Sequence, residues 1–203
     1  MSLNKLETLE VSGTPEEIGF AVGKNMADSI RETVLPLGEF QQSQRNWKGS
    51  SYLKKLDEAA RNVFPAYVLE LEGMARGAQV DYESLLIWNC RGDLPLLADA
   101  NPESAEHTPE GCTTLLYPST EDADALIAHN EDGPPELDGH CRWLTVTQAN
   151  GTKFSTFHYP GMLPGHTFSV NSHGLVQTIN NIRVDDLQSG IPRHFICRAI
   201  LDC

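Results

Sequence analysis

The sequence has few basic residues, no long apolar run and no closely spaced cysteine pair. Lysine and arginine total 15 against 28 aspartates and glutamates, which gives a formal net charge of -13 at pH 7. Such a chain repels the phosphate backbone of nucleic acids and anionic membrane surfaces, so we expect neither as a partner. No apolar run is long enough to cross a bilayer, and the start of the chain lacks the basic flank and apolar stretch of a signal peptide. We therefore expect a soluble, cytoplasmic protein.

The five cysteines are odd in number and show neither a C-x-x-C pair nor the spacing of a zinc site. A disulfide framework is therefore not expected. In a reducing compartment most of these cysteines should be small core residues, and only an unusual local context would give one of them a chemical role.

The first half of the chain carries helical patterns. Thr14 to Glu17 form a capping box with proline at the first helical position, and apolar residues then recur at helical spacing as far as Val34. This pattern predicts one long amphipathic helix. Further helices are predicted over 51–63, 66–77 and 81–88. Residues 92–111 collect proline, glycine and acidic side chains without periodicity, which is typical of an exposed linker.

After the linker, short β-type runs alternate with turn residues. Strands are predicted over 112–117, 125–129, 143–148, 153–159, 166–170 and 175–182. Asn150-Gly151 is a strong hairpin signal, and Ser172-His173-Gly174 marks a second turn. These features predict an antiparallel sheet.

The two halves together predict a single α+β domain. Its helical segment, 1–111, ends in the linker, and its antiparallel β segment is 112–203. A last helix over 192–203 directly follows the strands that it should cover. This position indicates that the domain is truncated at its C-terminus.

Cys112 stands where the linker meets the first predicted strand, directly after Gly111. If the bond between these two residues is broken, Cys112 gains an α-amino group whose ordinary pKa is about 7.7–8.0, so the amine can act as a base for the thiol beside it. Gly111 would allow the strained backbone in which the thiol attacks the carbonyl before it. Residue type alone favours the alternative of a buried strand cysteine.

Several motifs bear on that choice. They are GTPEEIG at 13–19, FPAY at 64–67, ELEGMARGA at 70–78, GCTT at 111–114 and HNED at 129–132. In this order and spacing they resemble the acyl-coenzyme A:6-aminopenicillanic acid acyltransferase family of N-terminal-nucleophile hydrolases. YPGMLPG at 159–165 and NSHGLV at 171–176 are similar to the branch of that family with carcinine and β-alanyl-dopamine hydrolases.

The resemblance implies an αββα sandwich and self-cleavage between Gly111 and Cys112, which would leave two fragments as a heterodimer. Cys112 would then attack an amide or thioester carbonyl. Asp132 matches the acid that orients the α-ammonium group. Asn180 matches an asparagine that donates to the substrate or the oxyanion, although Asn181 leaves the register open by one residue.

Further expectations concern the substrate. The motifs place three more residues near it, namely Thr113, His129 and Asn130. The substrate would be a small acyl amine, such as a β-alanyl amine, or an acyl thioester, and the acyl group would be hydrolysed or transferred. We expect no cofactor and no metal, and the resemblance allows a homo-oligomer.

Three alternatives remain open from the sequence. A zinc hydrolase could use histidines that follow Cys112, although none forms an H-x-H or H-x-x-x-H pair. These histidines are His129, His140, His158, His166, His173 and His194. A thiol hydrolase that pairs Cys112 with His129 or His173 would need no cleavage. The third alternative is a binding module or inactive fragment without enzymatic activity.

Overall fold

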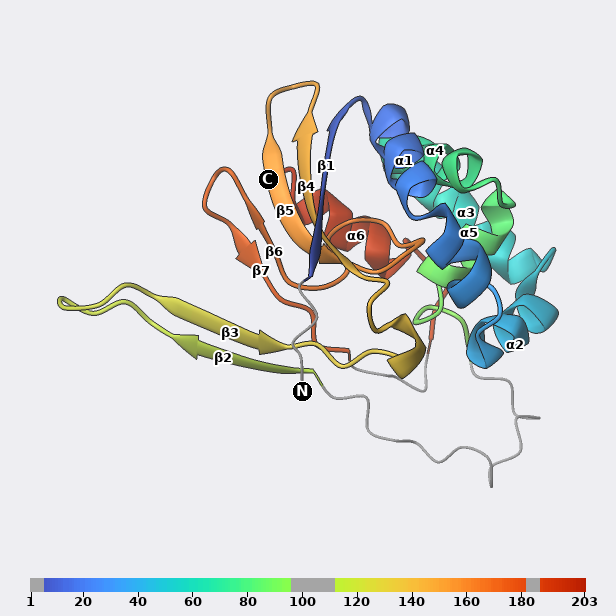
Figure 1. The fold of residues 1–203 in the computed structure, drawn as a ribbon. Helices are drawn as coiled ribbons and strands as arrows, with labels where there is room; N and C mark the ends of the chain where they lie inside the picture. The colour runs from blue at the N-terminus through green and yellow to red at the C-terminus, as the bar shows by residue number, and fades with distance from the viewer. Residues whose placement is uncertain (1–5, 96–111, 182–186) are drawn as a thin grey trace.

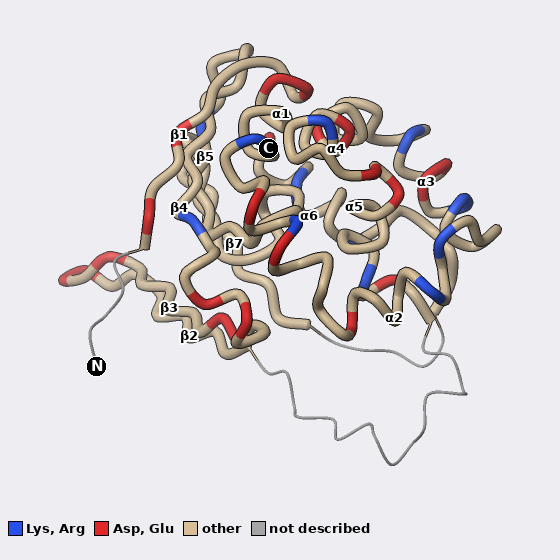
Figure 2. The backbone as a smooth tube through the Cα atoms, turned by 45° about the vertical axis from the view of Figure 1, so that its right-hand side comes forward, with Lys and Arg blue, Asp and Glu red and all other residues tan. Residues whose placement is uncertain are grey.

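The computed structural model of the protein describes residues 6–95, 112–181 and 187–203. Its helices are α1 (Pro15–Asn25), the π-helix η1 (Ser29–Val34), α2 (Gly38–Trp47), α3 (Ser51–Val63), α4 (Pro65–Ala78), α5 (Tyr82–Asn89), the 3-10 helix η2 (Pro135–Leu137) and α6 (Arg193–Ile200). None of the helices in these ranges is both long and apolar enough to cross a bilayer. Figure 2 shows acidic and basic residues interspersed along the described elements.

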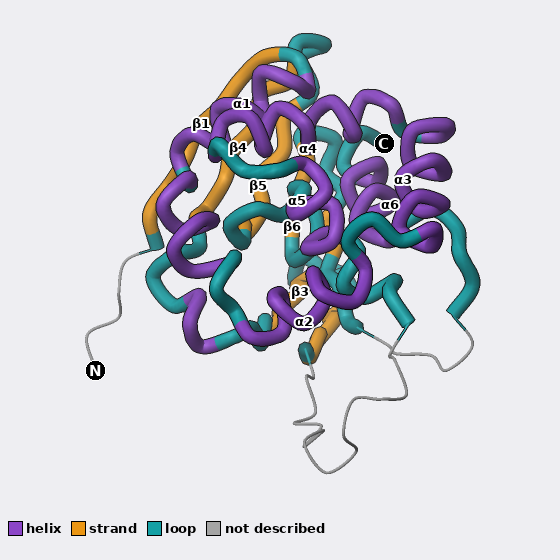
Figure 3. Tube along the Cα trace, turned by 90° about the vertical axis from the view of Figure 1, so that its right-hand side faces the viewer, coloured by secondary structure: helices purple, strands orange, loops and turns teal. Residues whose placement is uncertain are grey.

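The strands form two sheets in the described part of the chain. They are β1 (Glu7–Gly13), β2 (Thr113–Tyr117), β3 (Leu126–Asn130), β4 (Arg142–Gln148), β5 (Lys153–His158), β6 (Ser169–Asn171) and β7 (Val176–Gln177). The larger sheet has the order β1-β4-β5-β6-β7, and β2 pairs with β3 alone. Helices α1 to α5 lie to one side of the larger sheet, and the β2–β3 ribbon extends away from the body (Figure 1). Seen from the helical side, the helices lie in front of the strands (Figure 3).

The predicted α+β class is confirmed, but two details of the prediction were wrong. The sheet is mixed rather than purely antiparallel, because β1 pairs parallel with β4 and comes from the segment expected to be helical. Strand β1 lies at the edge of the sheet and buries only Val11, so its apolar alternation is short. The long helix predicted to Val34 ends at Asn25, and the chain continues into η1. Most of the predicted linker lies outside the described residues.

Close contact between α1 and α4 organises the helical half. A Cβ atom at Gly19 would lie 1.8 Å from the carbonyl oxygen of Glu70, and one at Gly77 would lie 2.2 Å from that of Phe20. Only glycine permits backbones to approach this closely. The glycines at 19, 73 and 77, which occur in the family motifs, and Gly23 one turn further along α1 therefore serve the packing of these two helices.

A buried ion pair links the helical half to the sheet. The Nε of Arg198 in α6 donates to Oε2 of Glu70 in α4 at 3.0 Å, and both side chains are 0% exposed. The guanidinium carbon also lies 4.6 Å from the ring centroid of Phe154 in β5. Helix α6 is therefore fixed against a helix that precedes the linker and a strand that follows it.

We predict that Arg198→Met lowers the free energy of unfolding by about 3–5 kcal/mol, because it leaves Glu70 buried without its counterion. The matched control is Arg76→Met, which breaks the exposed pair of Arg76 with Glu16 and should cost about 0–1 kcal/mol. Urea denaturation of both variants measures the difference. Equal costs for the two variants would contradict a central role for the buried pair.

Candidate active site

Cys112 directly precedes β2, and a strand pairing brings a second motif beside it. Strand β2 runs antiparallel to β3, with Thr113 opposite Asn130 and Thr114 opposite His129. The chain that leaves β3 therefore passes the Cys112 end of β2 and delivers residues 131 and 132 there. Cys112 itself is half-buried. Gly111, the other residue of the predicted cleavage bond, lies outside the described residues.

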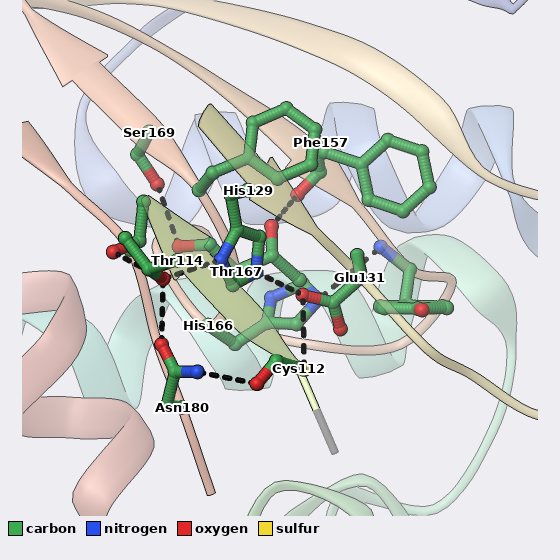
Figure 4. A network of polar contacts seen from close by, with 12 residues as sticks. Cys112, Thr114, His129, Glu131, Phe157, His166, Thr167, Ser169 and Asn180 are labelled. Atoms are coloured by element: carbon green, nitrogen blue, oxygen red, sulfur yellow. Dashed lines mark hydrogen bonds and ion pairs between the residues drawn. The ribbon is translucent and has the colours of Figure 1, made fainter. Parts of the chain in front are cut away.

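Asn180 binds the backbone of the candidate nucleophile (Figure 4). Its Nδ2 donates to the carbonyl oxygen of Cys112 at 2.5 Å, and its Oδ1 accepts from the hydroxyl of Thr114 at 2.7 Å. A carbonyl oxygen can only accept, so this contact fixes which way the amide points. The neighbouring Asn181 instead accepts from Nη1 of Arg193 at 2.6 Å. Of the two asparagines, Asn180 is therefore the one in contact with Cys112.

His129 is held in one orientation by the same network. Its Nδ1 lies 2.9 Å from Oγ1 of Thr114, and its Nε2 lies 3.2 Å from Oε2 of Glu131. Because the Thr114 hydroxyl gives its single proton to Asn180, Nδ1 of His129 must be the donor to Thr114. The side chain of His129 is only 3% exposed.

Glu131 is the carboxylate that meets the thiol. Sγ of Cys112 donates to Oε2 of Glu131 over 3.9 Å. Burial raises the pKa of the Glu131 carboxyl, while His129 acts in the opposite direction. Sequence reasoning passed over Glu131 because it took the acid of the HNED motif to be Asp132. The spacing could have indicated Glu131, because residues 129 and 131 share one face of an extended chain.

The Cys112 thiol is protonated at neutral pH in the uncleaved chain. Burial raises its pKa, and the negative charges of Glu131 and Asp132 raise it further, although a hydrogen bond from the backbone N–H of Asp132 opposes them. An attack by this thiol therefore needs a base to take its proton. The candidates are Glu131, which contacts the thiol, and His129, which has a ring nitrogen within 4.8 Å of it.

A cavity of about 280 Å³ adjoins the thiol. It is lined by residues from α2, α5, the start of α6 and the chain after β3. Its charged lining residues are Glu39, Arg91, Glu131, Asp132 and Arg193. A second hollow of about 530 Å³, beside Gly133 and Tyr159, does not include Cys112 in its lining. The smaller cavity is therefore the one that could present a substrate to the thiol.

The structure thus brings four of the predicted site residues to one place. Cys112 and Asp132 line the cavity, while His129 and Asn180 contact the network around Cys112. Thr113 and Asn130 are exposed and lie opposite each other in the ribbon, away from the lining of the cavity. Their contact with a substrate stays a prediction.

Three residues at this site could hold a metal ion. One ligand atom each from Cys112, His129 and Glu131 lie within 4.8 Å of one another. Among the described residues no other histidine belongs to such a group. His158, His166 and His194 instead pack against one another in the core, with ring centroids 5.5 and 5.8 Å apart and inclined ring planes. Burial lowers the pKa of His158 to about 3, so it is neutral.

Comparisons with known proteins agree with the motifs. Residues 119–203 match the family model of acyl-coenzyme A:6-aminopenicillanic acid acyl-transferase. The chain is 32% identical over 208 aligned residues to the beta-alanyl-dopamine/carcinine hydrolase of Drosophila melanogaster, covering 95% of this chain and 53% of that protein. It is 25% identical over 197 aligned residues to the 40 kDa form of the acyl-coenzyme A:6-aminopenicillanic-acid-acyltransferase of Emericella nidulans, covering 94% of this chain and 51% of that protein.

The matched proteins are named as a hydrolase of β-alanyl-dopamine and carcinine and as an acyltransferase. The comparisons confirm the resemblance to the acyl-coenzyme A:6-aminopenicillanic acid acyl-transferase family that the motifs predicted. The chain spans about half the length of the curated relatives that it matches.

We predict that Glu131→Gln speeds alkylation of Cys112 severalfold at pH 8. Removing a negative charge beside the thiol lowers the pKa of Cys112. When the pH is below the pKa of a thiol, a lower pKa gives a larger fraction of the reactive thiolate. Iodoacetamide labelling of the uncleaved chain, followed by peptide mass mapping, separates Cys112 from the exposed Cys203. Glu136→Gln, a change at an exposed carboxylate of η2, is the control. Unchanged or slower labelling in Glu131→Gln would show that this carboxylate does not act on the thiol.

Proposed function

We propose that the protein is a cysteine amidohydrolase or acyltransferase that cleaves its own chain before Cys112 and then forms an acyl-thioester on that residue. The observation that carries the proposal is the arrangement at Cys112. Its carbonyl is held by Asn180, its thiol faces Glu131, and it borders a cavity. The family model and the relative that the chain matches support the same reaction class.

Self-cleavage begins with attack of Sγ of Cys112 on the carbonyl carbon of Gly111. Glu131 or His129 takes the thiol proton as the new C–S bond forms. The C–N bond then breaks, the α-amino group of Cys112 receives a proton, and Gly111 remains as a thioester. Water hydrolyses this thioester, which leaves a carboxylate on Gly111 and a free thiol on Cys112.

The freed α-amine then serves as base for turnover. The thiolate attacks the carbonyl of an acyl amine, the amine product leaves with a proton, and water or an acceptor takes the acyl group from sulfur. Asn180 positions the nucleophile through its first N–H, and its second N–H is proposed to donate to the oxyanion. Asp132, on the cavity wall, is proposed to hold the α-ammonium group.

We infer small N-acyl amines as substrates. One relative is named for β-alanyl-dopamine and carcinine, and the three carboxylates on the cavity wall can pair with the ammonium group of a β-alanyl amide. Arg91 and Arg193 also line the cavity, and they could instead pair with a carboxylate of the substrate. A panel of β-alanyl amines, acyl amino acids and acyl thioesters distinguishes these classes.

The proposal also covers the fold, the cellular compartment and the association of the two fragments. We propose that the two sheets are the β layers of an αββα sandwich, in which the ribbon's exposed Leu115, Leu116 and Tyr117 would be covered. Free cysteines suit a reducing compartment, so we place the protein in the cytosol. After cleavage the two fragments would remain together as a heterodimer.

A second candidate is a thiol hydrolase that works without cleavage. The Cys112 thiol contacts Glu131, whose carboxylate also faces Nε2 of His129, so an acid and an imidazole that could take the thiol proton lie beside an uncleaved Cys112. His173, the other predicted partner, lies in the turn after β6 and is exposed. Whether the chain cleaves separates the two candidates.

We predict that the purified protein yields fragments of 111 and 92 residues, the second beginning at Cys112. Cys112→Ala should leave a single chain, because it removes the attacking sulfur. Asn180→Ala should slow cleavage by about 100-fold, the typical cost of one lost donor at such a site. Intact mass spectrometry over time measures both effects.

Asn25→Ala is the matched control, because Asn25 is an exposed asparagine at the end of α1. It should cleave like the unaltered protein. Circular dichroism checks that each variant is folded. A folded protein that stays intact and turns over substrate would favour the uncleaved thiol hydrolase, and cleavage that survives Cys112→Ala would rule out both candidates.

A further inference from the structure

Three side chains that can bind a metal ion meet at the Cys112 thiol. Nδ1 of His129 donates to Thr114, so Nε2 is the ring nitrogen that faces Glu131. Nε2 lies 3.2 Å from Oε2 of Glu131, and Sγ of Cys112 lies 3.9 Å from the same oxygen. A nitrogen, an oxygen and a sulfur atom therefore converge on one place.

The separations of these atoms suit a tetrahedral metal ion. Zinc bonds of about 2.0–2.3 Å to N, O and S ligands place neighbouring ligands roughly 3.3–3.6 Å apart. The pairs here are 3.2 Å between His129 and Glu131 and 3.9 Å between Glu131 and Cys112, and all three atoms lie within 4.8 Å of one another. Small side-chain shifts therefore bring the three into coordination distance.

The surroundings complete such a site. Thr114 accepts the Nδ1 proton of His129, which is the second contact that a metal-binding histidine ordinarily makes. Cys112 and Glu131 line the 280 Å³ cavity, which gives an entry path and room for water as a fourth ligand. A thiolate and a carboxylate together neutralise a divalent cation.

We propose that Cys112, His129 and Glu131 form a binding site for Zn²⁺, which inhibits the protein reversibly. On binding, the Cys112 thiol loses its proton to solvent and its sulfur becomes a metal ligand, so it can no longer attack a carbonyl. The proposal that zinc binds depends only on the positions of these three side chains. The inhibition rests on the proposed function, because it requires that Cys112 be the nucleophile.

The test measures metal binding and chemistry separately. Zinc affinity is measured by competition with a chromophoric chelator, and Co²⁺ serves as a probe whose charge-transfer absorption reports a thiolate ligand. We expect one zinc ion per chain and loss of the cobalt–thiolate band in Cys112→Ala. His129→Ala and Glu131→Gln should each weaken binding by at least about 100-fold, since each removes a ligand.

The matched controls are Cys203→Ala and Glu136→Gln, which alter an exposed thiol and an exposed carboxylate outside the site. Both should bind zinc like the unaltered protein. Absence of stoichiometric binding at micromolar zinc would overturn the proposal. So would binding that survives Glu131→Gln, a variant that keeps the shape of the side chain, in protein shown to be folded.

Cleavage and turnover are then followed with zinc and with excess EDTA. Zinc should suppress both and EDTA should restore them. Zinc binding in a protein that is inactive even with EDTA would support the metal site and contradict the proposed function. Activity with EDTA that zinc does not alter would overturn the inhibitory role.

Discussion

Arg198 lies in the core between α4 and β5, where its guanidinium meets Glu70 and stacks over Phe154. A charge buried this completely is tolerated only with its partner in place, so the three elements that meet there cannot separate independently. Glu70 precedes the linker, and the other two residues follow it. The pair therefore joins the two segments that cleavage before Cys112 would create.

Contacts near the site join the same two segments. Trp88 in α5 donates from its indole to the carbonyl of Pro160 at 3.0 Å, and the Asn89 side chain binds the backbone at Gly161 and Leu163. The cavity beside Cys112 has one wall from α2 and α5 and another from the chain after β3. Holding the halves together thus also holds the cavity in shape, which is what a cleaved enzyme would need.

Local sequence patterns predicted the helices and strands whose boundaries are set by neighbouring residues. The boundaries of α3 follow from the Ser50 cap and from Pro65, and the β4–β5 hairpin follows from Asn150-Gly151. Strand β1 was missed because its partner β4 is far away in the sequence, and Glu131 was missed because a neighbouring acid matched the family motif. The contact of Asn180 with Cys112 spans 68 residues, so only the family resemblance could suggest it.

The central claim is that Cys112 carries the acyl group during turnover. The most direct measurement is rapid acid quenching of the protein during reaction with a β-alanyl amide, followed by mass spectrometry of its fragments. The account predicts an added acyl mass on the fragment that begins at Cys112, and no turnover in Cys112→Ala. An acyl adduct on another residue, or turnover that persists in Cys112→Ala, would contradict it.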